Sequence, residues 1–527
     1  MQLRTFQQHI PCLIGLIFGL LFFCINITSS DFSKVPGDLG DARFNNYILE
    51  HAHLFFTGKI SEFWNAPFIY PEKNIIAYSD NLLGSAPFYS LFRLAGKNTQ
   101  DSFQYWFILM TLLNYLSCYI LLFYLFRNPY SAALGALIFA FSIALQSQIV
   151  HAQLFPRFAI PLCILAAVVY LKNLNPFYFL LSLIALIYQF YCGMYMGFLL
   201  FITLFFFFLI SFIYQFKEYI IKAKNVKWWL HMFGSLLLSV LLLLPLIIPY
   251  SEKATGSTLY EYWEVVNSLP STRSFFYSHP GSYLWKFLEN TGKNYQAFWD
   301  HQIFPGAIAI VSFILFSVLI IKRNLVPNKS TQLEKSPMVT LFLTAICLFI
   351  FFIRYQDYSL YRIIFMLPGF DSMRALQRIV NIELLFFGIA FAYLCNVLFT
   401  KTKKISFILF FMGLSIFYID NSIREDAADV YEKKVSSERI KKLNAKLKHL
   451  KKGTIFSYEP DTIRGLVIYH QLDAMLCAQE NNLKCLNGYT SNSPNIYSYY
   501  WLSPNKMTRR IWLTMRGVPE SQISIIK

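Results

Sequence analysis

Gly37-Asp38-Leu39-Gly40-Asp41-Ala42-Arg43-Phe44-Asn45 begins ten residues after an apolar run, Ile10 to Ile27, that is long enough to form a first membrane helix. The run has little charge before it beyond Arg4 and no small-residue cleavage pattern after it, so we interpret it as a retained signal anchor. The stretch therefore places two carboxylates and an arginine just outside a bilayer, where the head groups of lipid-linked molecules lie. This position predicts chemistry at the membrane surface.

The composition of the whole chain is that of a membrane protein. Of its 527 residues, 56% are hydrophobic and only 14% are charged, and the mean hydropathy is +0.44. These values exclude an ordinary soluble globular protein and predict an all-α polytopic membrane protein. Apolar runs of roughly 17 to 25 residues predict about eleven spans, near residues 10–27, 104–126, 130–148, 157–172, 176–191, 193–214, 230–250, 303–321, 338–353, 379–399 and 405–420.

The positive charges predict the orientation of these spans. Lys and Arg fall on alternate connections, among them Arg127, Lys172, Lys217, Lys322 and Lys404. Positively charged connections face the cytoplasm, so we expect the N-terminus to be cytoplasmic and, with an odd number of spans, the C-terminus to lie outside. No organellar address is present, which favours a bacterial plasma (inner) membrane.

The polar mass is concentrated on the expected outer side. Residues 1–424 form a predicted multi-span membrane domain with a large first outer loop, about 29–103, which we expect to lie along the membrane surface as short amphipathic helices. Residues 425–527 are polar and long enough to fold alone as a soluble extracytoplasmic domain. Its pattern predicts a small α/β domain containing a Lys-rich helix, a strand and a second helix, at 431–452, 454–458 and 470–480.

The formal net charge of +17 does not indicate nucleic-acid binding, because inner connections and the tail helix account for it and no recognition motif is present. Anionic membrane lipids are the expected partners of these charges. No P-loop or Rossmann glycine pattern appears, and no set of residues has metal-ligand spacing, so neither a cofactor nor a metal is predicted. Cys477 and Cys485 share the outer tail, where a disulfide between them is one possibility.

Asp38 and Asp41 are the first candidates for a catalytic role. A carboxylate can take the proton of an acceptor hydroxyl as the hydroxyl attacks a sugar carbon, as an inverting sugar transfer requires. The alternative is that one of them caps the helix that begins near Ala42, and capping is the more frequent role of an Asp at such a position. The residues alone leave both roles open.

A second set of charges precedes the span at 379–399. Arg374 and Arg378 are spaced i, i+4, so on a helix they share one face that can bind a phosphate or diphosphate. The alternative is that they are interfacial anchors whose charged ends reach toward water. Glu383 lies about one turn further into the span, where an acid is costly unless it is paired, and Arg374 or Arg378 is its expected partner. His151 and Gln153 lie at the outer end of another span, either to orient a sugar or as ordinary interfacial residues.

Four groups of residues together resemble the GT-C superfamily of membrane glycosyltransferases, in particular the large bacterial group similar to protein mannosyltransferases and aminoarabinose transferases. These groups are the stretch at 37–44, Trp64-Asn65-Ala66-Pro67 with Tyr70-Pro71, His151-Ala152-Gln153, and Pro368-Gly369-Phe370 with Arg374 and Arg378. The tail segments 470–475 and 487–490 also look familiar from uncharacterised members. The likeness covers most of the membrane region.

The resemblance implies a polyprenyl-phosphate sugar as donor, reached from the bilayer, and a first-loop Asp as general base. Asp41 fits this role better than Asp38, because Asp41-Ala42-Arg43-Phe44 looks like the family's acid followed by Arg or His and an aromatic residue. Many relatives have Glu where this chain has Ala42, so the likeness does not extend to a second acid or a metal there. Arg374 and Arg378 would hold the departing phosphate. The expected pocket residues are Arg43, His151, Gln153 and Glu383.

The expected function is therefore transfer of a sugar from a lipid phosphate to a glycan, lipid or protein acceptor on the outer side, with the tail helping to choose the acceptor. A transporter or flippase for lipid-linked glycans is the main alternative. Such proteins carry charges deep within several spans, whereas Glu383 is nearly alone here, and the hydropathy shows no inverted repeat. A scaffold for envelope assembly is a third candidate, and it would tolerate loss of Asp41 and Arg374.

Overall fold

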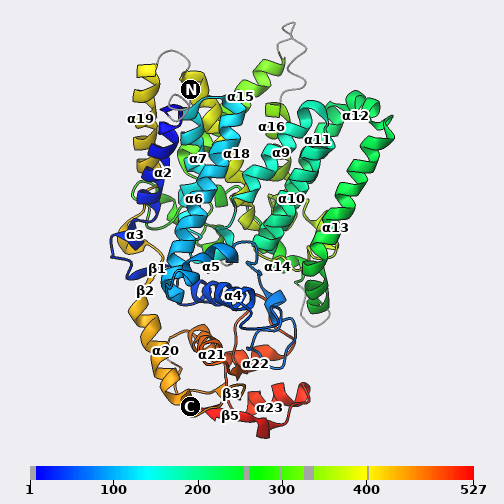
Figure 1. The fold of residues 1–527 in the computed structure, drawn as a ribbon. Helices are drawn as coiled ribbons and strands as arrows, with labels where there is room; N and C mark the ends of the chain where they lie inside the picture. Colours follow the sequence, from blue (N-terminus) through cyan, green and yellow to red (C-terminus); the bar gives the residue numbers. More distant parts are fainter. Residues whose placement is uncertain (1–6, 255–259, 297, 326–336, 400–402, 464) are drawn as a thin grey trace.

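The computed structural model describes residues 7–254, 260–296, 298–325, 337–399, 403–463 and 465–527. A bundle of long helices forms the upper part of the molecule, and a smaller region built from the end of the chain lies below it (Figure 1). We call residues 430–527 the C-terminal region, and the end of the bundle that faces it the site end.

The bundle helices follow the apolar runs of the sequence, because a helix satisfies its own backbone hydrogen bonds where no water is present. They are α2 (Ile10–Phe23), α6 (Thr99–Phe126), α7 (Pro129–Phe141), α9 (Ala159–Asn173), α10 (Pro176–Cys192), α11 (Met194–Tyr214), α13 (Val226–Ala254), α15 (Ala307–Leu325), α16 (Pro337–Phe352), α18 (Val380–Leu398) and α19 (Lys403–Asn421). Short helices α3 (Ile25–Thr28), α8 (Ile143–Gln146) and α12 (Phe216–Ala223) extend or connect them.

Each of the eleven predicted ranges overlaps one of these helices. Within the described residues, seven helical segments are long and apolar enough to cross a membrane, and four further apolar helices have 10–17 residues. The chain is a multi-pass membrane protein. The full count of eleven spans and the orientation of the termini stay predictions.

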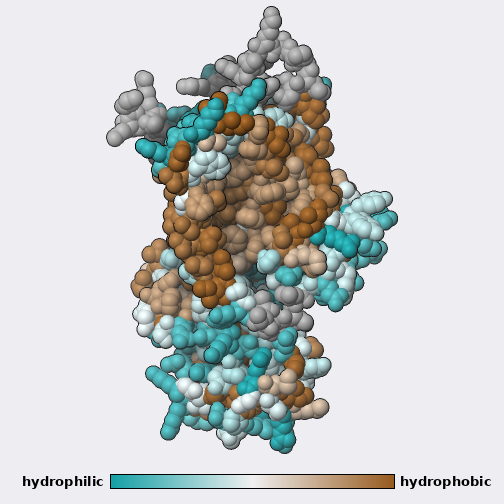
Figure 2. Space-filling model, turned by 90° about the vertical axis from the view of Figure 1, so that its right-hand side faces the viewer, coloured by the Kyte–Doolittle hydropathy of each residue, from teal (hydrophilic) through white to brown (hydrophobic). Residues whose placement is uncertain are grey.

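The surface of the bundle is apolar. Figure 2 shows a broad hydrophobic face over the upper part of the molecule, hollowed at its centre, and a mostly hydrophilic lower part. Helix α13 contributes much to the exposed apolar surface, with Leu230, Phe233, Leu237 and Leu241 all exposed. Lipid chains can cover such side chains in a membrane, where exposure to water would be unfavourable.

Helix α7 lies at the centre of the bundle, and every residue from Ser131 to Phe141 is buried. It packs against α2, α6 and α18. At the crossing of α7 and α18 two glycines meet, and a Cβ on Gly388 would lie 2.6 Å from the carbonyl oxygen of Gly135. Small residues at this point let the two backbones approach closely, as is common between membrane helices.

The first loop forms a compact layer at the site end. Its elements are β1 (Lys34–Pro36), α4 (Asp41–Phe56), η1 (Ile75–Tyr78) and α5 (Ala86–Leu94). Helix α4 does not have the exposed polar face of an amphipathic surface helix, because every residue from Ala42 to His53 is buried. Helix α4 contacts α6 of the bundle as well as α21 (Val467–Asn481) of the C-terminal region. It is therefore an internal helix of the protein.

Two further segments connect bundle helices at the site end. The segment between α13 and α15 contains α14 (Tyr262–Asn267), η3 (Ser274–Phe276), η4 (Lys286–Asn290) and η5 (Phe298–His301). The segment between α16 and α18 contains α17 (Arg362–Phe365) and η6 (Leu376–Ile379). A short helix, η2 (Ala152–Leu154), precedes α9.

The C-terminal region contains a parallel sheet of three strands in the order β4-β3-β5, with Ile455 opposite Ile523. Its elements are β2 (Val430–Glu432), α20 (Lys433–Leu447), β3 (Ile455–Tyr458), α21, β4 (Lys484–Cys485), α22 (Tyr497–Leu502), α23 (Lys506–Met515), η8 (Glu520–Gln522) and β5 (Ile523–Ile526). Helices α20 and α21 and strand β3 agree with the predicted elements. Strand β2 pairs with β1, which ties this region to the first loop. Cys477 and Cys485 are free thiols and form no disulfide.

Candidate functional site

Asp38 and Asp41 have different positions at the start of α4. The helix begins at Asp41, and the Asp38 carboxylate accepts a hydrogen bond from the backbone N–H of Ala42 at 3.2 Å. Asp38 thus satisfies one of the free N–H groups at the helix start, which is the capping role considered for both residues. The Asp41 carboxylate turns instead toward the bundle. The structure therefore gives the two candidates different contacts.

Asp41, His151 and Asp300 form a row of alternating charges. The Nδ1 atom of His151 lies 2.9 Å from Oδ2 of Asp41, and its Nε2 atom lies 3.5 Å from Oδ1 of Asp300. The three residues come from the start of α4, the loop before η2, and η5. Each side chain is about a fifth exposed or less, so the row is reachable from solvent yet largely enclosed.

The protonation states follow from these contacts. Burial would lower the pKa of His151, but its hydrogen bonds with Asp300 and Asp41 outweigh burial and raise the pKa to about 9. Burial would raise the pKa of Asp41, but His151, Tyr489 and the charge of Arg378 lower it below its usual value. The pKa of Asp38 rises to about 6 because of burial and repulsion by Asp41. At neutral pH an imidazolium therefore lies between ionised Asp41 and Asp300.

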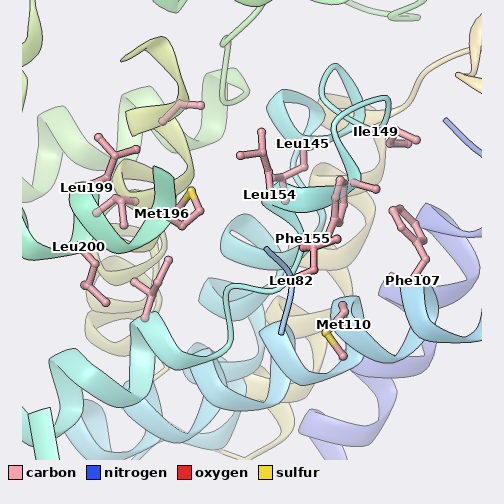
Figure 3. Close-up of a cluster of buried hydrophobic side chains, with 14 of the residues drawn as sticks. Leu82, Phe107, Met110, Leu145, Ile149, Leu154, Phe155, Met196, Leu199 and Leu200 are labelled. Atoms are coloured by element: carbon pink, nitrogen blue, oxygen red, sulfur yellow. The ribbon is translucent and has the colours of Figure 1, made fainter. Parts of the chain in front are cut away.

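Packing beneath the site holds the His151 loop in place. Figure 3 shows Ile149, Leu154 and Phe155, which flank His151 in the chain, among buried side chains from α6 and α11. Phe155 contacts Phe107 of α6, with ring centroids 4.5 Å apart. His151 therefore projects from an apolar anchor that fixes its backbone.

Arg378 lies beside this row with its guanidinium over the ring of Tyr195, 4.8 Å from the ring centroid. Its charge acts on Asp41, Asp300 and Asp80, yet it forms no ion pair within 4.0 Å in the described part of the chain. Asp80 accepts a hydrogen bond at 3.3 Å from the backbone N–H of Tyr195, at the start of α11. Arg378 is thus held by an aromatic face and by charges at a distance, which leaves N–H groups for a ligand.

Arg374 has a similar environment. Its guanidinium lies over the ring of Tyr260, 5.6 Å from the centroid, and its side chain is exposed. The hydroxyl of Tyr195 accepts a hydrogen bond from the backbone N–H of Arg374 at 2.8 Å. Tyr195 thus contacts both arginine segments. Arg374 and Arg378 both lie at the site end. Arg374 is in irregular chain and Arg378 is in η6, so the two do not share one α-helix face.

Tyr489 reaches the site from the C-terminal region. Its hydroxyl donates a hydrogen bond to Oδ1 of Asp41 at 2.6 Å. The ring meets Phe44 edge to face, with centroids 5.3 Å apart. Asp41 is therefore contacted by the bundle through His151 and by the C-terminal region through Tyr489.

Three predicted pocket residues have other positions. Arg43 is buried and forms an ion pair with Asp473 of the C-terminal region at 2.7 Å, because on α4 it faces away from Asp41. Gln153 accepts a hydrogen bond from Asn45 at 2.8 Å and so links η2 to α4. The expected ion pair of Glu383 with Arg374 or Arg378 is wrong. Both carboxylate oxygens of Glu383 are buried in α18 without a hydrogen-bond partner among the described residues.

Sequence reasoning missed Asp80, Asp300, Tyr195 and Tyr260 and assigned no role to Tyr489. None of the five has a second chemically active residue at a spacing that is typical of a catalytic or binding motif. Only Asp300 could have been proposed as a site residue from its position in the sequence. It stands beside His301, just before a predicted span, on the side of the membrane where the other candidates were expected.

No group of three or more His, Cys, Asp or Glu side chains among the described residues is arranged to hold a metal ion. In the site itself, the imidazole of His151 lies between Asp41 and Asp300. The positive charge that these two carboxylates face is thus supplied by the protein.

The architecture of this chain is similar to that of solved structures of known proteins. No family model matches the chain, and no curated protein matches its sequence. Among solved structures, it resembles the archaeal oligosaccharyltransferase AglB from Archaeoglobus fulgidus in complex with an inhibitory peptide and a dolichol-phosphate, with a TM-score of 0.53, 12% identity, and coverage of 98% of this chain and 69% of that one. The apo form of an oligosaccharyltransferase from the same organism gives a TM-score of 0.50, 11% identity, and coverage of 96% and 68%.

The fold of this chain is therefore similar to that of these oligosaccharyltransferase structures. At 11–12% identity the likeness concerns the fold alone. It agrees with the GT-C resemblance of the sequence motifs, whereas the likeness to bacterial protein mannosyltransferases and aminoarabinose transferases stays a prediction.

Proposed function

We propose that this protein is a membrane glycosyltransferase that moves a sugar from a polyprenyl-phosphate donor to an acceptor outside a bacterial plasma membrane. One observation carries the proposal: on a GT-C fold, Asp41 is paired with His151 and lies beside Arg378, whose guanidinium has no carboxylate within 4.0 Å among the described residues. This arrangement supplies a base for an acceptor and a cation for a leaving phosphate.

Arg374 and Arg378 bind the donor phosphate in this proposal. Each of the two guanidinium groups lies over an aromatic ring. Among the described residues, no carboxylate lies within 4.0 Å of either group. A carboxylate in direct contact would occupy the N–H donors that a phosphate needs. Phosphate is a good leaving group when cations stabilise the charge that develops on it, so no acid has to protonate it.

Asp41 acts as the general base. The acceptor hydroxyl oxygen attacks the anomeric carbon and forms the new glycosidic bond, while the bond from that carbon to the phosphate oxygen breaks. The electron pair of the broken bond leaves with the polyprenyl phosphate, and the hydroxyl proton moves to the Asp41 carboxylate. Attack from the side opposite the phosphate inverts the configuration. His151 keeps Asp41 ionised before the attack, and the reaction uses only side chains of this chain and the two substrates.

The apolar surface of the bundle supports a donor that arrives through the bilayer. The hydrophobic face of Figure 2 is hollowed above the site end, and a polyprenyl tail in such a hollow would present its phosphate at the membrane surface. We place the site end on the outer side of the membrane. The N-terminus is then cytoplasmic, and the C-terminal region lies outside, where it meets the glycan, lipid or protein acceptor.

The proposal is tested by mass spectrometry of envelope glycans and glycolipids in a strain that lacks this protein. The strain is complemented with wild type, Asp41→Asn or the control Asp461→Asn, which changes an exposed aspartate of the C-terminal region that forms an ion pair with Lys527. We expect a sugar to disappear in the deletion strain and to return with wild type and Asp461→Asn but not with Asp41→Asn, at equal membrane levels. Full rescue by Asp41→Asn would instead favour a transporter or an assembly scaffold.

A further inference from the structure

Both oxygens of the Asp41 carboxylate are engaged by other side chains. His151 contacts Oδ2 at 2.9 Å, and the hydroxyl of Tyr489 donates to Oδ1 at 2.6 Å. The proposed reaction explains the first contact, because His151 keeps Asp41 ionised. It assigns nothing to the second, which comes from a separate part of the fold more than 400 residues along the chain.

The Tyr489 loop is built into the structure. The backbone N–H of Gly488 donates to Oε1 of Gln471 at 3.0 Å, and that of Tyr489 faces the sulfur of Met475 at 3.1 Å. Gly488 touches the first loop so closely that a Cβ there would lie 2.3 Å from Cγ1 of Ile69. The phenol is thus held against Asp41 by packing on both sides, which orients the hydroxyl before any substrate arrives.

We propose that Tyr489 is a positioning residue through which the C-terminal region orients the Asp41 carboxylate for proton transfer. This inference rests on the proposed role of Asp41 as base. It gives the C-terminal region a part in the chemistry in addition to the expected choice of acceptor.

Tyr489 keeps its own proton throughout the transfer. A carboxylate oxygen has two lone pairs, so Oδ1 can accept from Tyr489 and from an acceptor hydroxyl at the same time. When the acceptor oxygen bonds to the anomeric carbon, its proton moves to Asp41 and the phosphate leaves with the electron pair. The phenol hydrogen bond restrains rotation of the carboxylate and favours its ionised form.

The groups around Asp41 set the direction of the expected effect. His151 and Arg378 favour the ionised carboxylate, whereas Asp38 opposes it. All three remain when Tyr489 is replaced by Phe, so the change removes a single hydrogen bond to a charged group. Loss of such a bond corresponds to a rise of about one unit in the pKa of Asp41.

The test compares the pH dependence of sugar transfer by membranes that contain wild type, Tyr489→Phe or the control Tyr499→Phe. Tyr499 is an exposed tyrosine of the same region. The readout is the glycan species that Asp41→Asn fails to restore. We expect Tyr489→Phe to lower the maximal rate and to move the acidic fall in activity about one pH unit higher, while Tyr499→Phe follows wild type. A Tyr489→Phe profile that coincides with wild type would overturn the inference.

A measurement that needs no substrate complements this assay. Apparent melting temperatures of purified wild type, Asp41→Asn, Tyr489→Phe and the double variant form a double-mutant cycle. We expect the changes in melting temperature caused by Asp41→Asn and Tyr489→Phe to be non-additive at neutral pH. Additive changes would contradict an energetic coupling between Asp41 and Tyr489. If Asp41→Asn keeps full transfer, the base of the proposed function is wrong. If Asp41→Asn is inactive and Tyr489→Phe behaves as wild type, only the inference about Tyr489 fails.

Discussion

At the scale of single residues, the charge on His151 decides how Asp41 and Asp300 interact. With the imidazole protonated, one positive charge lies between two negative ones. When the imidazole loses its proton, the two carboxylates repel each other with no cation between them. Because the pKa of His151 is raised to about 9, the imidazole loses its proton only at alkaline pH.

We therefore expect sugar transfer by wild type to fall as the pH rises through about 9. His151→Gln should be slower throughout and should lack this fall. The pKa is raised above its unfolded value of 6.5, so the stabilisation by His151 is complete below pH 6.5 and is lost as the pH rises through about 9. The gap in melting temperature between wild type and His151→Gln should close over the same interval, and a gap that is constant with pH would contradict this assignment.

Arg374 provides a test of donor binding. Its exposed guanidinium is free to bind phosphate, so Arg374→Ala should weaken the binding of a labelled polyprenyl phosphate to the purified protein about tenfold or more, since hydrogen bonds to charged groups contribute about 1.5–3 kcal/mol. Arg374→Lys should keep part of the affinity. Arg510→Ala removes an arginine of the C-terminal region and serves as control. Unchanged affinity in Arg374→Ala would remove its proposed role.

The residues that the sequence did not reveal share one property. Asp41, His151, Arg374 and Arg378 were found because they occur in short polar motifs beside apolar runs. Asp80 and Asp300 lie outside those motifs, and Tyr489 lies in a tail segment to which no role was assigned, so only the folded chain brings the three residues to the site. The choice between Asp38 and Asp41 as the helix cap depended on one backbone hydrogen bond, to Ala42, which residue types do not determine.

At the scale of elements, long apolar runs predicted the bundle helices because a span must be both apolar and helical. The position of α4 was not predictable in the same way. Its sequence alternates polar and apolar residues as a surface helix does, yet Ala42 to His53 are buried. Polar groups such as Arg43 and Glu50 are satisfied by partners distant in sequence, Asp473 and Arg93, which no local pattern reveals.

The crossing of α7 and α18 offers a test of packing. A methyl group on Gly388 would lie 2.6 Å from the backbone oxygen of Gly135, and neither backbone can yield easily. Gly388→Ala should therefore destabilise the protein by about 1–3 kcal/mol, as overpacking does. Gly234→Ala on α13 is the matched control, because nothing lies within 4 Å of the added Cβ. Equal melting temperatures for the two variants would show that the crossing is looser than described.

At the scale of the whole molecule, the C-terminal region is tied to the membrane bundle through the first loop. Strands β1 and β2 pair, and Asp473 on α21 lies between Arg43 and Arg439, each at 2.7 Å. The sequence predicted the helices and strand of this region but not its docking. Docking depends on the surface shape and charge of two parts separated by more than 400 residues.

The ion pairs of Asp473 with Arg43 and Arg439 at this interface can be tested by mutation. Asp473→Ala would leave Arg43 buried without its partner, and we expect a loss of about 3–5 kcal/mol in stability together with weaker transfer. The double variant Arg43→Met with Asp473→Leu should recover much of the stability, because it removes both buried charges. Asp461→Ala, at an exposed site of the same region, is the control. A harmless Asp473→Ala would show that this ion pair does not hold the two parts together.

In the proposed reaction, Asp41 takes the acceptor proton while a sugar leaves a lipid phosphate. The most direct measurement incubates the lipid extract of the Asp41→Asn strain with purified wild type or Asp41→Asn protein and follows polyprenyl lipids by liquid chromatography and mass spectrometry. We expect wild type, given the native acceptor fraction, to convert a sugar-carrying polyprenyl phosphate into free polyprenyl phosphate, and Asp41→Asn to leave it intact. Equal conversion by both proteins would exclude Asp41 as the base, and no conversion by wild type would exclude sugar transfer from a polyprenyl phosphate.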